Sequence, residues 1–253
     1  SVFASVALPA ASNAQSTFLN QVFIGQFRPD PDAKPRWPGN LKQYKLAVVG
    51  SDLNVVDAMG ASIVDPGTGF IEKCTNSFWS KSDTYWKLGL KLDLEEAEIC
   101  KTGASNSSES NAPDGPIVEK GGQAQWLRAI TPPANRRVYT CSNDFATCAA
   151  TPVLTNFATS NLSLTPALTG LTAESINWAR GLDIHDEDKN PSTTNNMRAS
   201  SHGDVVHSRP VAINYGTDAV PKVVVFYSGN DGMLRAINGN RPDLHDTPVG
   251  GVE

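Results

Sequence analysis

Four residues in the string HGDVVHS have side chains that could do chemistry: His202, Asp204, His207 and Ser208. Histidine, aspartate and serine make up a hydrolytic triad, and two histidines could also hold a metal ion. On a strand, however, the neighbouring His207 and Ser208 point to opposite faces. His202 and His207 also lack the i, i+4 spacing of the helical histidine pair in zinc hydrolases. We therefore expect structural hydrogen-bonding groups here, and we expect the chain not to be an enzyme.

An acidic loop, RGLDIHDEDKN, precedes these residues. Its oxygen-bearing side chains, Asp183, Asp186, Asp188 and Asn190, suit a hard cation such as calcium. The spacing Asp-x-Asp-x-Asn matches the first half of an EF-hand loop, but Pro191 stands where that loop has glycine and no glutamate follows at the twelfth position. Two interpretations stay open, a calcium site and a solvated acidic turn. We expect no organic cofactor.

The four cysteines contain no C-x-x-C pair, so a zinc knuckle or a thioredoxin-like redox motif is not indicated. Cys141 and Cys148 enclose a loop short enough to be closed by a disulfide, and Cys74 with Cys100 would then close a longer one. The alternative is four reduced thiols in a reducing compartment. We expect the disulfides Cys74–Cys100 and Cys141–Cys148, in an exported protein.

The elements that must position these side chains are predicted to be mainly β-strands. Glycine (20) and proline (17) are frequent, and only 19% of the 253 residues are charged. This composition favours short strands joined by turns and excludes a helical bundle. Short helices are predicted after Gly122 and from Ala173 to Arg180. Alternating or β-branched runs predict strands at residues 21–27, 41–49, 53–58, 61–65, 136–141, 205–214, 222–228 and 233–238.

Two segments depart from this pattern. Residues 1–18 are small, apolar and interrupted by proline, which predicts an extended N-terminal arm or an edge strand. Residues 70–135 hold an aromatic cluster and then the polar run KTGASNSSESNAPDG, which predicts an insertion with a mobile loop. Because a long loop escapes the packing demands of a sheet, the part from Gly69 to Gly115 is a candidate surface for variable contacts.

Charge and hydropathy exclude two classes of partner. The net charge is −5 and the chain has no basic cluster, whereas binding to nucleic-acid phosphates needs lysine and arginine gathered on one face. Apolar runs are interrupted well before about 18 residues, so we expect no membrane-spanning helix.

The most informative segment is a C-terminal hairpin. A β-branched run, Lys222 to Ser228, is followed by the turn residues Asn230, Asp231 and Gly232 and by an amphipathic return strand. Asn, Asp and Gly tolerate positive φ, so we expect them to be the structural turn of the hairpin. Hairpins of this kind build the blades of β-propellers, although no strict period is visible in the rest of the chain.

Several strings carry a resemblance. RGLDIHDEDKN, HGDVVHSRPVAINYG and VVVFYSGNDGMLRAING closely resemble the C-terminal β-propeller domain of the PilY1/PilC family of type IV pilus biogenesis factors. FLNQVFIGQFRPD, PRWPGNLKQYKL and NAPDGPIVEKGGQAQWLR are also similar to parts of that domain. The matches lie in order from Phe18 to Gly239.

The resemblance implies a β-propeller-like fold with quinoprotein-type blades over residues 19–253, containing the insertion. At about 40–45 residues per blade, the chain without the insertion supplies roughly four or five blades, so we expect a partial propeller. The family's role implies a non-enzymatic, cell-surface component of the type IV pilus system, exported from a Gram-negative-type bacterium. It implies pilus assembly and surface adhesion through binding of pilins or minor pilins.

Two other functions stay open. In the first, the apolar arm adds to the open sheet edge of a neighbouring copy, and the chains form an extracellular filament. In the second, the hairpin belongs to a quinoprotein-like dehydrogenase, whose blades it also resembles. That class needs a complete ring around its cofactor and matched tryptophans, whereas the tryptophans here are irregularly spaced: Trp37, Trp79, Trp86, Trp126 and Trp178.

Overall fold

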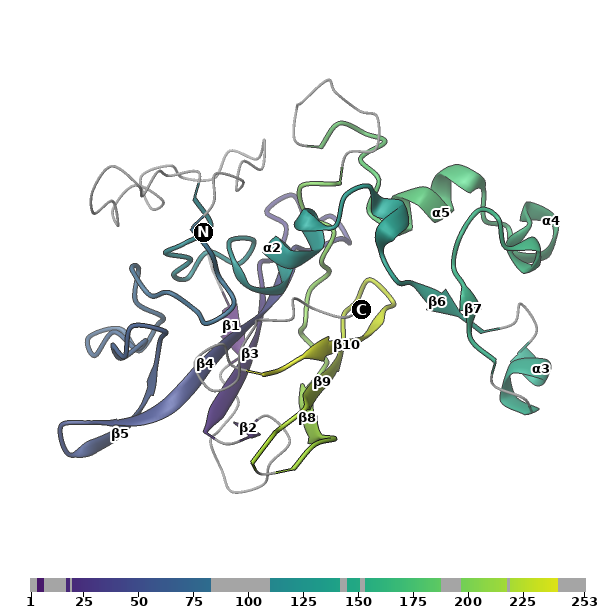
Figure 1. Ribbon diagram of the computed structural model, residues 1–253. Coiled ribbons are helices and arrows are strands. Elements are labelled where there is room, and N and C mark those ends of the chain that lie inside the picture. The colour runs from purple at the N-terminus through teal and green to yellow at the C-terminus, as the bar shows by residue number, and fades with distance from the viewer. Residues whose placement is uncertain are drawn as a thin grey trace.

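The computed structural model contains three small antiparallel sheets and a few short helices, so the prediction of a mainly β chain is confirmed. It describes residues 4–6, 17–18, 20–82, 110–141, 145–150, 153–187, 197–217 and 219–240. Figure 1 shows the first two sheets next to each other and the third set apart among helices. In the described part of the chain the sheets stay open and do not close into a ring.

The first sheet has the order β1–β3–β4–β5, and β2 also pairs with β3. The tight β4–β5 turn depends on Gly50, whose φ of 65° is open to glycine at little cost. β1 forms one edge, pairing antiparallel with β3 of the same chain. The strands are Ala4–Val6 (β1), Thr17–Phe18 (β2), Gln21–Phe27 (β3), Gly39–Val49 (β4) and Asp52–Val56 (β5).

The second sheet has the order β10–β9–β8. Its strands are Val211–Asn214 (β8), Val223–Ser228 (β9) and Leu234–Asn238 (β10). The predicted hairpin is β9–β10, and Gly232 in its turn has a φ of 80°. β-branched residues of β9 alternate between buried and half-buried positions, which is the pattern of a strand with one face on a core.

Both faces of the first sheet are covered, which explains why β3 is buried along nearly its whole length. On one face, Phe23 and Leu41 share a core with Val225 and Ile237 of the second sheet. On the other face, a second core holds Val22, Ile24, Tyr44 and Ile63. Alternate residues of one strand therefore enter two different cores.

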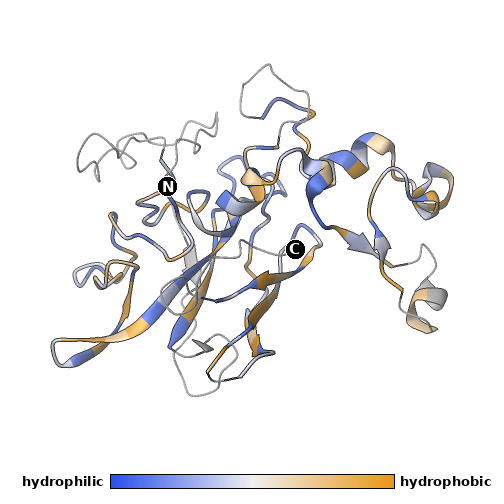
Figure 2. Ribbon diagram, in the orientation of Figure 1, coloured by the Kyte–Doolittle hydropathy of each residue, from blue (hydrophilic) through white to orange (hydrophobic). Residues whose placement is uncertain are grey.

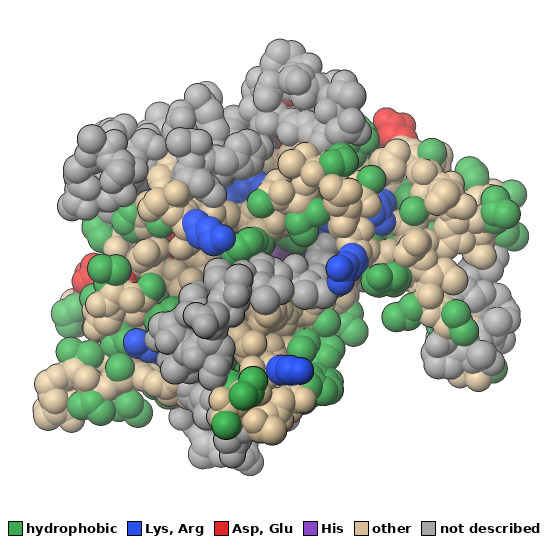
Figure 3. Space-filling view, in the orientation of Figure 1, with side chains coloured by type: hydrophobic (Ala, Val, Ile, Leu, Met, Phe, Trp, Pro, Cys, Tyr) green, Lys and Arg blue, Asp and Glu red, His purple; other side chains and the backbone are tan. Residues whose placement is uncertain are grey.

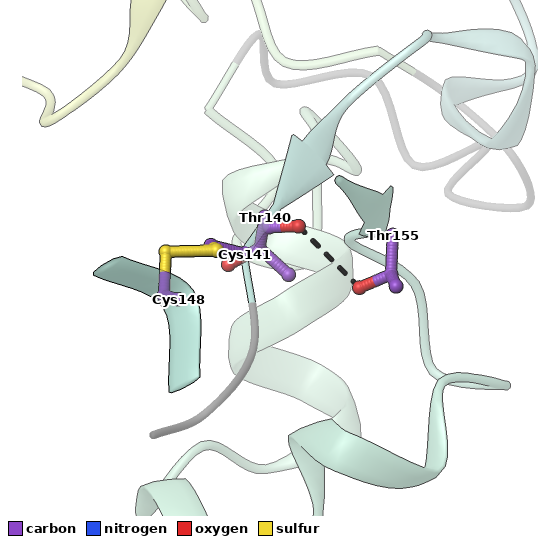
Figure 4. Close-up of a disulfide and its surroundings, with 4 residues drawn as sticks. All are labelled: Thr140, Cys141, Cys148 and Thr155. Carbon is purple, nitrogen blue, oxygen red and sulfur yellow. Dashed lines mark hydrogen bonds between the residues drawn. A yellow bond between two sulfur atoms is a disulfide. The ribbon is translucent and has the colours of Figure 1, made fainter. Parts of the chain in front are cut away.

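The third sheet pairs Tyr139–Thr140 (β6) with Thr155–Asn156 (β7). The disulfide Cys141–Cys148 joins the end of β6 to helix α3 (Phe145–Ala150), with Cα atoms 5.7 Å apart (Figure 4), so this predicted pair is confirmed. Cys74 is also disulfide-bonded, but Cys100 lies outside the described residues, and the pair Cys74–Cys100 stays a prediction.

The helices are short. Helix α5 begins where Thr172 accepts a hydrogen bond from the Ser175 N–H, a side-chain cap. None of the described helices is long and apolar enough to cross a membrane. The helices are Gly122–Ala129 (α2), Phe145–Ala150 (α3), Pro166–Thr169 (α4) and Ala173–Ala179 (α5), with single 3₁₀ turns at Pro133–Asn135 (η1) and Leu162–Leu164 (η2).

Three predicted strands are shorter or missing. Residues 61–65 make only isolated bridges, and the strand predicted at 136–141 shrinks to β6. The strand predicted at 205–214 starts only at Val211. Just before the predicted range the backbone bonds to the hairpin turn: the Gly203 N–H donates to Asp231 and the Asp204 carbonyl accepts from the Asn230 N–H. Local alternation cannot reveal such a competing partner.

The predicted insertion is partly built into the core. The described ranges at its two ends, 70–82 and 110–135, include the buried residues Trp79, Asp114 and Leu127. Helix α2 lies against β4 (Figure 1), with Asn40 of β4 accepting the Ala124 N–H at 2.9 Å. Residues 83–109, the central part of the predicted contact loop, lie outside the described residues.

Candidate functional site

A pocket of about 260 Å³ lies where the β9–β10 turn meets the proline-rich β3–β4 loop, the end of α5 and residues 198–204. We call it the Trp178 pocket. It brings together residues that the sequence presents in four separate places. The side chains that could do chemistry in its lining are Arg36, Trp37, Trp178, Arg198, Ser201, His202, Asp204, Asn230 and Asp231.

His202 is buried and both of its ring nitrogens are engaged. Nδ1 lies 2.7 Å from the Gly203 carbonyl oxygen, and Nε2 lies 2.7 Å from the Tyr227 hydroxyl oxygen. Because a carbonyl oxygen only accepts, Nδ1 donates and Nε2 accepts from Tyr227. Burial, and then the nearby charge of Arg235, lower the pKa of His202 to about 3. The imidazole is neutral near pH 7 and links residues 202–203 to β9.

Two of the other three residues of HGDVVHS, Asp204 and Ser208, also make structural contacts. The Asp204 carboxylate accepts from the Asn230 side-chain amide at 2.6 Å, and Ser208 Oγ accepts from the Ser228 N–H at 2.8 Å. His207 is exposed. Since both nitrogens of His202 are occupied elsewhere, this histidine is not placed to activate Ser208 as a nucleophile.

The predicted turn residues tie the hairpin to the segment beside it. Asp231 accepts from the Gly203 N–H at 2.9 Å and forms an ion pair with the buried Arg235. Burial opposes ionisation of Asp231, but its hydrogen bonds and the charge of Arg235 outweigh burial and lower its pKa to about 2. Gly203 fits only as glycine, because a Cβ there would lie 2.6 Å from Asp231 Cβ.

The acidic loop is only partly described. Asp183 is buried, and its Oδ1 accepts from the Glu187 N–H at 2.9 Å, while Asp186 has a φ of 51°. Asp188 and Asn190 lie outside the described residues. Within the described ranges, no group of three or more His, Cys, Asp and Glu side chains is placed to hold a metal ion. The calcium site therefore stays a prediction.

An arginine and tryptophan stack forms one wall of the pocket. The guanidinium carbons of Arg36 and Arg198 lie 5.4 Å and 4.0 Å from the Trp178 ring centroid. Glu187 makes two hydrogen bonds to Arg36, at 2.9 Å and 3.0 Å, and its carboxylate lies 3.8 Å from Arg198. Burial lowers the pKa of Arg198 to about 10. No sequence spacing indicates this stack, since its members come from three distant segments.

A buried polar network lies beneath the insertion, and no sequence pattern predicted it. Lys42 of β4 is fully buried, and its Nζ donates to the carbonyls of Gly115 (3.0 Å) and Ile117 (2.8 Å) and pairs with Asp114 at 3.2 Å. Ser77 donates its N–H and its hydroxyl to the same carboxylate. Burial lowers the pKa of Lys42, although Asp114 opposes the shift. This network anchors the NAPDG motif, so the motif is structural.

An exposed apolar surface lies at the end of the β4–β5 hairpin. Val48 and Leu53 are cross-strand partners and are 70% and 66% exposed. Met59 and Phe70, which follow in the chain, are also exposed. Hydrophobic colour runs along this hairpin in Figure 2, and hydrophobic side chains gather at its end in Figure 3. We call the facing pair Val48 and Leu53 the hairpin patch. Large exposed side chains grouped in this way are typical of protein contact surfaces.

Comparisons of this chain with protein-family models, with curated proteins and with solved structures found no match.

Proposed function

We propose that this chain is a non-enzymatic, exported protein-binding component of a type IV pilus system, acting in pilus assembly and surface adhesion through pilins or minor pilins. The observation that carries the binding role is the hairpin patch, because Val48 and Leu53 project apolar surface that a protein partner would cover. The strings that resemble the PilY1/PilC family supply the pilus part of the proposal.

Two further features support export and a binding role. The Cys141–Cys148 disulfide is of the kind that persists in oxidising compartments, which favours a location outside the cytoplasm. In the Trp178 pocket, His202 and Asp204 are used in structural hydrogen bonds, which favours a scaffold over catalysis.

We also propose that the β8–β9–β10 sheet is part of one blade of a partial propeller. A blade is a four-stranded antiparallel sheet, and these three consecutive strands form an antiparallel meander of that type. An experimental structure of the protein isolated from its source should show sheets arranged around a common axis. Sheets that share no common axis would contradict the assignment.

The binding proposal is tested with purified major and minor pilins from the source organism, measured by biolayer interferometry. We expect the wild-type chain to bind at least one pilin and Leu53→Asp to weaken binding about tenfold or more, because a charge in an apolar contact is costly. Leu168→Asp is the matched control, since Leu168 is 60% exposed on α4, away from the patch. If the chain binds no pilin, the pilus role is refuted. If Leu53→Asp binds pilin as tightly as the wild type, the hairpin patch is not the binding surface.

A second candidate function is a filament subunit. It is favoured by β1, an edge strand contributed by the N-terminal arm, because such a strand can pair with the same edge of a neighbouring copy. Light scattering and negative-stain microscopy of the wild type and of a variant lacking residues 1–15 test it. Long particles that disappear on deletion support the filament, and unchanged particles rule out arm exchange.

A further inference from the structure

A second hollow, separate from the Trp178 pocket in most of its lining, lies between β10 and β6. It has a volume of about 620 Å³, and both strands contribute residues to its lining. We call it the β6–β10 groove. One wall is formed by residues 231–236 and the other by residues 137–140. Its large apolar lining residues are Tyr139, Leu154, Phe157, Phe226 and Leu234.

The β10 wall offers main-chain groups to a partner. The Gly239 N–H donates to Val223 O, and the register pairs Ile237 with Val225. Hydrogen-bonded pairs alternate along an antiparallel ladder, so the N–H and C=O groups of Leu234 and Ala236 point away from β9. No strand pairs with this edge within the described residues.

The β6 wall has the same property. The Phe157 N–H donates to Val138 O, and Tyr139 is registered with Asn156. By the same alternation, the main-chain groups of Tyr139 point away from β7. Both walls of the groove therefore contain a strand edge. The residues whose main-chain N–H and C=O groups point outward from these edges also line the groove.

The β10 edge lacks the usual protection against strand addition. Edge strands are commonly guarded by charged side chains, proline or a bulge. Here the groove-lining residues with outward main-chain groups are Leu234, which is 76% exposed, and the half-buried Ala236. Arg235, between them, points inward and is paired with Asp231. A hollow with edge main-chain groups on both sides and apolar side chains along it is complementary to an extended polypeptide.

We propose that the β6–β10 groove binds an extended segment of another protein as an added β-strand, paired with the edge of β10. The segment carries apolar residues at alternate positions, facing Phe226 and Leu234. Among the charged residues of the lining, Arg235 and Asp231 form an ion pair with each other. Arg137 is exposed, so we expect the bound segment to carry an acidic residue that can pair with it.

The occupant is a foreign segment and not the arm of a second copy, because residues 1–18 contain no Asp or Glu that could meet Arg137. This inference concerns a different surface from the hairpin patch and does not depend on the pilus assignment. It stands even if no pilin binds.

The experiment uses a phage-displayed library of random decapeptides, selected on the wild-type chain, and synthetic copies of the enriched peptides. Ala236→Pro removes the outward N–H of the β10 edge without touching the ladder to β9. Ala212→Pro is the matched control, because Ala212 has the same outward geometry on the opposite edge, β8. Leu234→Lys changes the apolar wall and leaves the main chain intact. Amide exchange at Val225 and Tyr227 reports whether a variant keeps the β9–β10 ladder, and exchange at Val224 and Phe226 reports whether it keeps the β8–β9 ladder.

We expect the enriched peptides to carry apolar residues at alternate positions. Ala236→Pro and Leu234→Lys should each weaken peptide binding about tenfold or more, and Ala212→Pro should bind the peptides like the wild type. The bound peptide should slow amide exchange at Leu234 and Ala236. The proposal is overturned if no peptide is enriched, or if Ala236→Pro and Leu234→Lys both bind like the wild type. It is also overturned if the wild type self-associates and Ala236→Pro abolishes that association, because the occupant is then a second copy.

Discussion

The buried His202 should make the chain lose stability on mild acidification. Its pKa is lowered to about 3 in the folded state, against an ordinary value of 6.5. A base with a depressed folded-state pKa stabilises the fold fully above its unfolded pKa, and this stability is lost as the pH falls toward the folded pKa. Between about pH 7.5 and pH 4.5, the unfolded chain takes up a proton at this site that the folded chain does not.

The size of the effect follows from the two pKa values. Each pH unit below the unfolded pKa costs about 1.4 kcal/mol, so the step to about pH 4.5 removes about 2.5 kcal/mol from the free energy of unfolding. Asp231, with a pKa of about 2, titrates below this range. Burial raises the pKa of Asp204, which acts in the opposite direction, but that carboxyl is present in all variants compared and cancels between them.

The assay is urea unfolding followed by tryptophan fluorescence at both pH values, for the wild type, His202→Gln and His207→Gln. Glutamine can still accept from the Tyr227 hydroxyl but does not titrate. We expect His202→Gln to be less stable near pH 7.5 and to lose about 2.5 kcal/mol less than the wild type on acidification. His207→Gln, at an exposed position, should follow the wild type. Equal losses in the wild type and His202→Gln would refute the reasoning.

Two other stability predictions follow from buried groups. Lys42→Met should lower the free energy of unfolding by about 3 kcal/mol, because it leaves the Asp114 carboxylate buried without its ammonium partner. The double variant Lys42→Met/Asp114→Asn should recover part of this loss in urea unfolding, and no recovery would mean that the charge pair is not the cause. Cys148→Ser should cost about 2 kcal/mol through the freed loop to Cys141. Reducing agent should destabilise the wild type at least as much, and a smaller effect would contradict the pairing.

Much of the sheet framework could be predicted from local patterns. The run from Gln21 to Phe27 alternates and forms β3 over those residues, and the β-branched run at residues 222–228 becomes β9. The helix expected after Gly122 is α2. The short spacing of Cys141 and Cys148 was also enough to predict their disulfide, because the loop that they close does not depend on any distant element.

The predictions were wrong where a distant partner competes with the local pattern. The strand predicted at residues 205–214 begins only at Val211, and next to its predicted start Gly203 bonds to Asp231 of the hairpin turn, 28 residues further on. Lys42 lies in a strand whose pattern does not reveal that its ammonium is buried among carbonyls of residues 114–117. Such positions depend on contacts between segments, which periodicity does not report.

By itself, the sequence determined the mainly β character, the β9–β10 hairpin and one disulfide, because each depends on residues close together in the chain. Only the tertiary structure decided the roles of the polar side chains. His202 became a buried link to Tyr227 and Asp231 a partner of both Gly203 and Arg235. The physical reason is that burial and hydrogen bonding set what a polar group does, and both depend on which distant segments fold against it.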